Sequence, residues 1–306
     1  MTELAIVFFV WGFASLANAT PLILVTLGET LGQRTGIINL GCEGGMLGGA
    51  CAGFGAAMAT GNPWLGMIAG AATGILFAAL HAALVLGARA NQLASGIAVW
   101  MLALGLTSYI GRAFVGGRVE ALPSLAGTWV SSLPLVGRGL EQLSVAAPIA
   151  ILLVLLAVWW LERTRTGLSW RVAGESALIA SENGMSPTRA RLSAVLVGGC
   201  LAGLGGAVLS VDYTQTWANE ITKGRGLIAV GLVIVARWNP RLVLPVCLLF
   251  GLAETAAVRL PAMGVEMSSY LLSGLPYAVV LAALVANHLA FAPAAAMPAD
   301  LKKVFD

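Results

Sequence analysis

The chain has 306 residues, of which 58% are apolar and only 10% are charged, and its mean hydropathy is +0.89. A soluble domain carries roughly 25% charged residues. The formal net charge of +3 is too small to indicate an anionic partner such as nucleic acid. These figures exclude a cytosolic globular enzyme, a disordered chain and a nucleic-acid-binding protein. They predict an all-α polytopic membrane protein embedded in a lipid bilayer.

The apolar runs, taken in chain order, predict about nine transmembrane helices. A span in contact with lipid needs roughly 20 apolar residues, and fewer where protein shields a broken helix. One run is too short for a lipid-exposed crossing, so we expect a half-helix there or a span extended by its polar flanks. The runs are 4–27, 36–59, 64–87, 93–111, 145–161, 192–211, 226–237 (the short one), 241–258 and 270–289.

Positive charge in the loops predicts the orientation of the chain. Cytoplasmic loops carry an excess of Lys and Arg, and residues 162–191 form the richest loop. We therefore expect this loop and the C-terminus in the cytoplasm, the N-terminus outside, and the chain in a bacterial plasma (inner) membrane. Met1 to Leu4 lacks the basic start of a signal peptide, so the first run is predicted to be a span itself.

Three short words recur in the two halves of the chain. Asn62-Pro63, Leu76-Phe77 and Ser95-Gly96 return as Asn239-Pro240, Leu249-Phe250 and Ser273-Gly274, at offsets of 177, 173 and 178 residues. Five predicted spans separate the matched elements, and an odd number inverts them across the membrane. The pattern predicts one transmembrane domain over 1–306 with inverted repeats at about 4–111 and 192–289, as in transporters. Chance recurrence of such words in apolar sequence is the alternative.

A glycine-rich stretch, GIINLGCEGGMLGGACAGFG, covers residues 36–55. Gly41, Gly45, Gly49 and Gly53 recur every four residues, which predicts a smooth helix face for close packing. So many glycines also weaken a helix, so we expect an unwound turn here.

Few polar side chains lie inside the predicted spans. Glu43 lies in the glycine-rich stretch with Asn39 one turn before it, and an ionisable group in a span faces a cavity or a partner. Glu43 therefore lines a solute path or is a packing lock held by neighbouring backbone or hydroxyl groups. Asn91, Gln92 and Ser95, which open the fourth span, are the other path candidates. We expect His81 to be a packing residue, and the four cysteines to be packing residues without a metal site. Glu254 either lines the path or pairs with Arg259, and a structural role is preferred.

The basic loop at 162–191 is the second informative stretch. Residues 175–182 predict a short helix with Gly174 before it and Gly184 after it. A short helix flanked by basic residues suits docking into a cleft of a soluble partner, and a solvated loop is the alternative. The chain contains no GxxxxGK[ST], GxSxG or HExxH motif. We therefore expect a permease energised by another subunit rather than an enzyme.

Four ordered segments resemble the permease subunits of ATP-binding-cassette importers for branched-chain amino acids and simple sugars. They are LGETLGQRTGIINLGCEGGMLGGA (27–50), NQLASGIA (91–98), TGLSWRVAGESALIASENGMSPTRARLSAVLVGGCLAGLGGA (166–207) and KGRGLIAVGLVIVARWNP (223–240). The likeness is greatest to the nucleoside-type branch, whose permeases work as pairs of sister subunits, and it covers most of residues 25–290. Arg237 is a departure, since relatives tend to have Gly before the Trp.

The resemblance implies a function, partners and site residues. It implies import of a nucleoside, or of a simple sugar or another small polar solute, by alternating access. The segment from Asn39 to Gly49 would line the path. The implied partners are a cytoplasmic subunit that binds ATP and Mg, a second permease and an extracytoplasmic solute-binding protein, with no cofactor in this chain. A secondary transporter or channel driven by an ion gradient is one alternative, and a sister subunit with a purely structural role is another. The residues expected to couple to the ATPase are Arg171, Gly174, Glu175, Ala180, Glu182 and Gly184.

Overall fold

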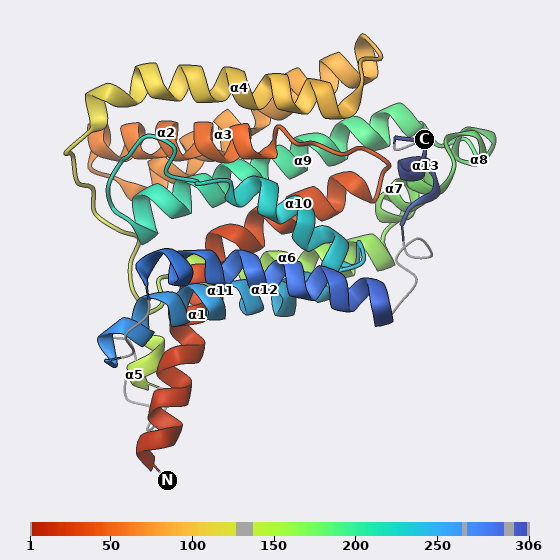
Figure 1. The fold of residues 1–306 in the computed structure, drawn as a ribbon. Coiled ribbons are helices and arrows are strands. Elements are labelled where there is room, and N and C mark those ends of the chain that lie inside the picture. Colours follow the sequence, from red (N-terminus) through yellow and green to blue (C-terminus); the bar gives the residue numbers. More distant parts are fainter. Residues whose placement is uncertain (1, 127–136, 265–267, 291–296, 305–306) are drawn as a thin grey trace.

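The computed structural model describes residues 2–126, 137–264, 268–290 and 297–304, and these ranges form a helical bundle without β-strands (Figure 1). The helices are α1 (Thr2–Gln33), α2 (Cys42–Thr60), α3 (Pro63–Ala82), α4 (Gln92–Ile110), α5 (Gly137–Leu140), α6 (Ala146–Arg163), α7 (Arg165–Glu175), α8 (Ala177–Glu182), α9 (Pro187–Ala207), α10 (Arg225–Val235), α11 (Pro240–Ala262), α12 (Ser269–Ala290) and α13 (Ala299–Lys302). One π-helical turn extends α3 (Ala83–Gly87) and another extends α9 (Val208–Tyr213).

Each of the nine predicted spans coincides with a helix, which confirms the fold class. Within the described ranges, seven helices are long and apolar enough to cross a membrane: α1, α3, α4, α6, α9, α11 and α12. The other two are α2, which is glycine-rich and mostly buried, and α10, which has only 11 residues. The protein is therefore a multi-pass membrane protein in which two of the expected spans are discontinuous and shielded by their neighbours.

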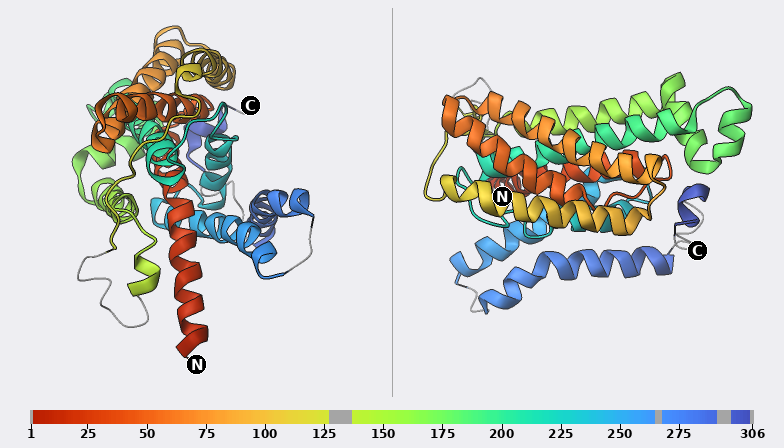
Figure 2. Two further views of the ribbon diagram at one scale, coloured as in Figure 1. Left: turned by 90° about the vertical axis from the view of Figure 1, so that its left-hand side faces the viewer. Right: turned by 90° about the horizontal axis from the view of Figure 1, so that it is seen from above.

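The bundle has two distinct ends. The short helix α5 lies at one end, while α7, α8 and α13 lie together at the other, and we call these the α5 end and the α8 end (Figure 1). Between them, α9 packs against α1, α2 and α3, and α11 packs against α1 and α12 (Figure 2). Small residues set this spacing: a Cβ on Gly203 would collide with the backbone of α3 at Gly70 and Gly74.

The two Asn-Pro words have the same local role. Asn62 and Asn239 both cap a helix, and each side-chain oxygen accepts a hydrogen bond from the backbone two residues on, at 2.9 and 3.1 Å. The proline takes the first helical position, where its missing N–H is no loss. The capped helices α3 and α11 start from opposite ends of the bundle (Figure 1), which is consistent with the predicted inverted repeat.

Candidate solute path and coupling surface

The chain leaves helical geometry between α1 and α2, at residues 34–41, which we call the break. The prediction of a helix from residue 36 was therefore wrong for its first six residues, whereas the expected unwound turn is present. Gly36 has a φ of +89°, a conformation that favours glycine. The break is buried almost throughout, so its backbone groups need partners within the protein.

Side chains from distant helices supply partners for the break. The Ile38 N–H donates to Gln92 Oε1 at 2.8 Å, and the Ile38 carbonyl lies 3.1 Å from His81 Nε2. The Asn39 N–H donates to Glu29 Oε1 at 3.0 Å. A segment that would be unstable in lipid is thus held in place by side chains of α1, α3 and α4.

The predicted path residues have different surroundings. Gln92 bonds to the break, and Ser95 Oγ lies 3.1 Å from His81 Nδ1, behind the break. Asn91 instead caps α4, accepting from Leu93 and Ala94, at an exposed position. Asn39 is buried, and its side-chain oxygen has no hydrogen-bond partner among the described residues.

Glu43 lies where the N-termini of α2 and α10 meet. Its carboxylate accepts from Thr222 Oγ1 at 2.6 Å, from the Gly224 N–H at 3.0 Å and from the Gly226 N–H at 2.6 Å. The two helices run from this point towards opposite ends of the bundle (Figure 1). Helix N-termini carry partial positive charge and unpaired amides, which a carboxylate satisfies. Glu43 therefore has the contacts of a packing lock, and we call this contact the Glu43 junction.

The junction tolerates no side chain at Gly226. A Cβ there would lie 2.6 Å from Glu43 Cα and 2.7 Å from Glu43 Oε2. Three glycines of the stripe, Gly41, Gly49 and Gly53, lie in similarly close contacts, whereas a Cβ on Gly45 would make only ordinary van der Waals contact. Gly41 faces the Gly96 carbonyl of α4, Gly45 faces Gly74 of α3, Gly49 faces the Gly203 backbone of α9, and Gly53 faces Gly66 and Ala207.

A half-buried ion pair adjoins the start of α10. Arg225 Nη2 lies 2.6 Å from Glu254 Oε1 of α11. Arg259, the partner considered from the sequence, donates instead to Gln142 at 2.9 Å. Residues five positions apart in a helix lie on different faces, so Arg259 points away from Glu254. Two residues before Arg225, the Lys223 carbonyl accepts a hydrogen bond from Tyr277 of α12 at 3.4 Å.

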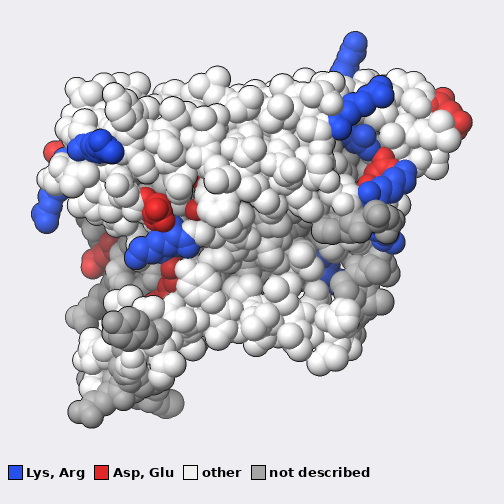
Figure 3. All heavy atoms as spheres, turned by 45° about the horizontal axis from the view of Figure 1, so that its top comes forward, with Lys and Arg blue, Asp and Glu red and all other residues white. Residues whose placement is uncertain are grey.

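Charged side chains gather towards the two ends of the bundle and leave its middle almost uncharged on the face in view (Figure 3).

The ion pair and Tyr277 together form what we call the α10 cluster: Arg225, Glu254 and Tyr277. Sequence analysis missed Arg225 and the Thr222–Gly226 amides. The available signal was a cation in a Gly-Arg-Gly word directly before a helix too short to cross the membrane.

The basic loop folds as two helices rather than one. The predicted helix is present as α8, whose N-cap Ser176 accepts from the Ile179 N–H at 3.3 Å. The residues before it, expected to be loop, form α7, because Thr164 caps them by accepting from the Gly167 N–H at 3.0 Å. Leu178 and Ile179 of α8 are 67% and 52% exposed.

The predicted coupling residues are divided between these two helices. Arg171, Gly174 and Glu175 lie in α7, and Ala180 and Glu182 lie in α8. Ala180 is buried and Glu182 is exposed. Gly184 ends α8 with a φ of +73°.

Gly174 does not precede a helix as expected. It packs inside α7 so closely against the Arg34 carbonyl that a Cβ would collide with it. The close approach joins α7 directly to the break. Burial and the neighbouring Arg171 guanidinium lower the pKa of Arg34, against the opposing effect of Glu175.

Arg191 connects three segments at the α8 end. Its Nε donates to the Thr35 carbonyl of the break at 3.1 Å, and its Nη2 donates to the Ala173 carbonyl of α7 at 3.3 Å. The same guanidinium pairs with Asp300 of α13. Burial raises the pKa of Asp300, but Lys303 and Arg191 outweigh it, so the pKa lies below its ordinary value.

Comparison with known proteins identifies the family. The profile described as branched-chain amino acid transport system / permease component matches residues 13–284. The chain belongs to this family. A permease component transports solute and is one part of a larger transport system, which agrees with the discontinuous helices described above. No solved structure shows a significant match.

Three curated relatives show the range of solutes within the family. A putative glucose ABC transporter permease from Haloferax volcanii is 36% identical, covering 83% of this chain and 78% of the relative. The guanosine ABC transporter permease NupQ of Bacillus subtilis is 31% identical over 80% and 81%. The nucleoside ABC transporter permease NupC of Lactococcus lactis is 31% identical over 84% and 85%.

Proposed function

We propose that this protein is a permease subunit of an ATP-driven importer of nucleosides in the bacterial plasma membrane, with its α8 end in the cytoplasm and its N-terminus outside. The Glu43 junction carries the proposal. Two discontinuous helices start there from one point inside the bundle, and transporters bind solute beside such half-helix ends. Family membership and the guanosine and nucleoside relatives support this function.

The α10 cluster supports a nucleoside in particular. Its ion pair offers hydrogen-bonding groups suited to hydroxyls and to a base edge. Tyr277, which bonds to the Lys223 carbonyl two residues before Arg225, is 47% exposed, and a flat base can stack on a phenol ring. A simple sugar is the second candidate, because the glucose permease is a relative and because sugar hydroxyls would use the same polar groups.

Coupling to ATP would act through α8. We place the ATP-binding subunit, which holds ATP and Mg, against the exposed Leu178 and Ile179. A movement of α8 passes to α7, and from α7 to the break through Gly174 and Arg191. The break leads into α2 and the Glu43 junction, so the path would alternate between its two openings as the ATPase closes and reopens.

The remaining partners follow from the same proposal. A solute-binding protein would deliver the nucleoside at the α5 end, and a second permease, most simply a sister subunit, would complete the path. Asn39, Asn91, Gln92 and Ser95 then act as the frame of the path rather than as solute ligands, because Gln92 bonds to the break, Ser95 bonds to His81, and Asn91 caps α4.

The test is solute-stimulated ATP hydrolysis in the whole complex, co-purified with its ATPase and reconstituted with the binding protein. We expect guanosine to stimulate hydrolysis and ATP-dependent uptake, while glucose and leucine do neither. Stimulation by glucose alone would replace the nucleoside assignment with the sugar one. Uptake by the permease without any ATPase would contradict the importer and support a secondary transporter or channel.

A further inference from the structure

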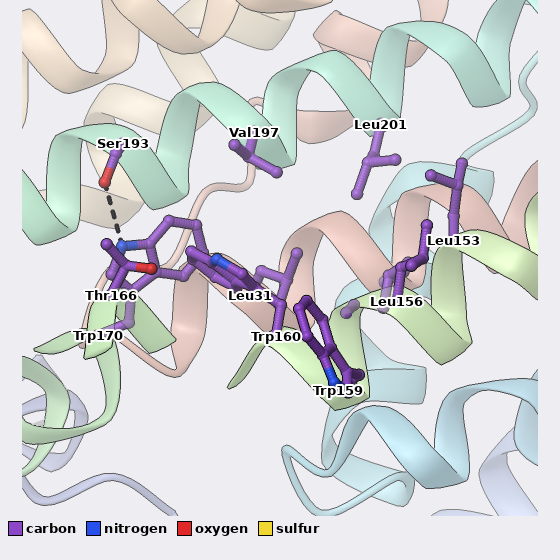
Figure 4. A pocket seen from close by; sticks show the side chains of 12 residues that line it. Leu31, Leu153, Leu156, Trp159, Trp160, Thr166, Trp170, Ser193, Val197 and Leu201 are labelled. Atoms are coloured by element: carbon purple, nitrogen blue, oxygen red, sulfur yellow. Dashed lines mark hydrogen bonds between the residues drawn. The ribbon is translucent and has the colours of Figure 1, made fainter. Parts of the chain in front are cut away.

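A groove near the α8 end is enclosed by α1, α6, α7 and α9 (Figure 4). Its volume is about 570 Å³. Leucines, valine and tryptophans make almost all of the wall, and the polar side chains in it are the hydroxyls of Thr166 and Ser193. Trp159 and Leu156, along one side, are 59% and 48% exposed. The groove therefore opens laterally, towards the surrounding membrane.

The end of the groove nearest α7 is closed by a fixed arrangement of side chains. Trp170 Nε1 donates to Ser193 Oγ at 3.1 Å (Figure 4). Trp160 packs edge-on against the Trp170 ring, with centroids 4.3 Å apart. An indole with its N–H satisfied and a second ring against it form a rigid wall. The groove is thus a built feature rather than a gap between mobile side chains.

The length of the groove matches one leaflet of a bilayer. At 1.5 Å per helical residue, Leu153 to Trp160 extends about 10 Å and Ser193 to Leu201 about 12 Å. The hydrocarbon core of a bilayer is ~30 Å thick. A transmembrane helix of another subunit would contact the bundle along most of that thickness. An acyl chain from a single leaflet fits a short, apolar, laterally open groove better.

Positive charge lies at the mouth of the groove. Arg163 follows Trp159 by four residues and Trp160 by three, so it continues the face of α6 that lines the groove. Arg165 directly precedes Thr166 of the lining. Both arginines are exposed and form no ion pair within the described ranges. The neighbouring Glu162 is already paired with Arg241 at 2.6 Å.

We propose that this groove binds one acyl chain of an anionic phospholipid, with the phosphate held between Arg163 and Arg165. Tryptophans prefer the membrane interface, and the basic side chains reach the headgroup level by extending along the helix. Arginine binds phosphate through a planar fork of donors. The inference depends on membrane insertion and not on the identity of the transported solute.

Photolabelling tests this site in the intact complex. The complex would be placed in phosphatidylcholine nanodiscs with a small fraction of photoactivatable phosphatidylglycerol, and labelled peptides mapped by mass spectrometry. We expect labels on 153–160 and 193–201. The double variant R163Q/R165Q should lower labelling about tenfold or more, because each arginine near an anionic surface contributes ~1 kcal/mol. R89Q, which removes an exposed arginine from the α3–α4 loop, should leave labelling unchanged.

A second variant tests the groove itself. Val197→Trp fills the groove from α9, so it should abolish labelling while thermal stability and both arginines are retained. Equal labelling by photoactivatable phosphatidylcholine would overturn the anionic specificity. Cross-links from the groove to a second permease, with no lipid label there, would overturn the lipid site and assign the groove to a subunit interface.

Discussion

The break before α2 and the start of α10 both lie at the beginning of a helix inside the bundle, yet they are held very differently. Glu29, His81, Gln92 and Arg191, from four helices, hold the break. The start of α10 is held at Glu43 by three hydrogen bonds to one carboxylate. Contacts from four helices make the break a rigid frame, whereas the start of α10 depends on one carboxylate and on the Arg225–Glu254 pair beside it, so it can be released as a unit. We infer that α10 moves during transport and that the break transmits the movement.

Loss of the Glu43 carboxylate should reduce uptake and stability more than any other single change, because this group holds the start of α10. In Glu43→Ala, the N-terminal amides of α10 lose a buried carboxylate whose charge-assisted bonds are each worth about 1.5–3 kcal/mol. We expect uptake to be abolished and the melting temperature of the complex to fall, while the subunits still assemble. Glu141→Ala, at an exposed position, is the control. Normal uptake by Glu43→Ala would refute the anchor, and lost uptake at unchanged stability would favour a solute ligand instead.

Two glycines of α10 form a matched pair that tests how closely this helix packs at the Glu43 junction. Gly226→Ala places a Cβ 2.6 Å from Glu43 Cα, whereas a Cβ on Gly231 meets nothing within 4 Å. We expect Gly226→Ala to reduce uptake strongly and to destabilise the complex by about 1–3 kcal/mol through overpacking. Gly231→Ala should be neutral or stabilising by up to ~1 kcal/mol, since alanine favours helix. Uptake and thermal unfolding would be measured for both variants. Equal uptake and equal melting temperatures of Gly226→Ala and Gly231→Ala would contradict a tightly packed Glu43 junction.

Removal of one of several contacts to the break should have a smaller effect. Gln92→Ala leaves the Ile38 N–H without its partner, at a cost of about 1–3 kcal/mol. Asn91→Ala, its neighbour, removes only a helix cap worth ~1 kcal/mol. We expect Gln92→Ala to retain partial uptake and to raise hydrogen exchange at 36–41. If it abolished uptake as completely as Glu43→Ala, the break would not be a redundantly held frame.

The smallest effect is expected at α13. The pKa of Asp300 is depressed in the folded protein, so its contribution is complete above its unfolded value and is lost as the pH falls through its folded value. Hydrogen exchange of residues 297–304, corrected for intrinsic rates, should therefore rise as the pH falls below about 4. Asp300→Asn should show the same rise at pH 7, while Asp306→Asn serves as the charge control. Unchanged exchange in Asp300→Asn would show that the buried Leu301 alone anchors α13.

Sequence reasoning predicted the fold class well, because hydropathy and glycine spacing are local properties. It located the helices of the nine predicted spans, the half-helix α10 among them, and also the unwound turn and α8. It missed α7, because the apolar stripe of that helix is short and its cap at Thr164 is not preceded by a clear loop signal. For Glu254 it offered a place on the path or a pair with Arg259 in the same helix, whereas the actual partner, Arg225, comes from another helix.

The sequence by itself determined that the chain lies in a membrane, where its long apolar helices are, and that Glu43 avoids lipid, since burying charge in hydrocarbon costs more than any local preference returns. Only the tertiary structure decided what each polar group contacts. Gln92 and Ser95 look like path residues in the sequence, yet Gln92 bonds to the break and Ser95 bonds to His81, which contacts the break. Their partners lie between 14 and 54 residues away along the chain. Such contacts depend on how helices pack, and no pattern within a single helix encodes that.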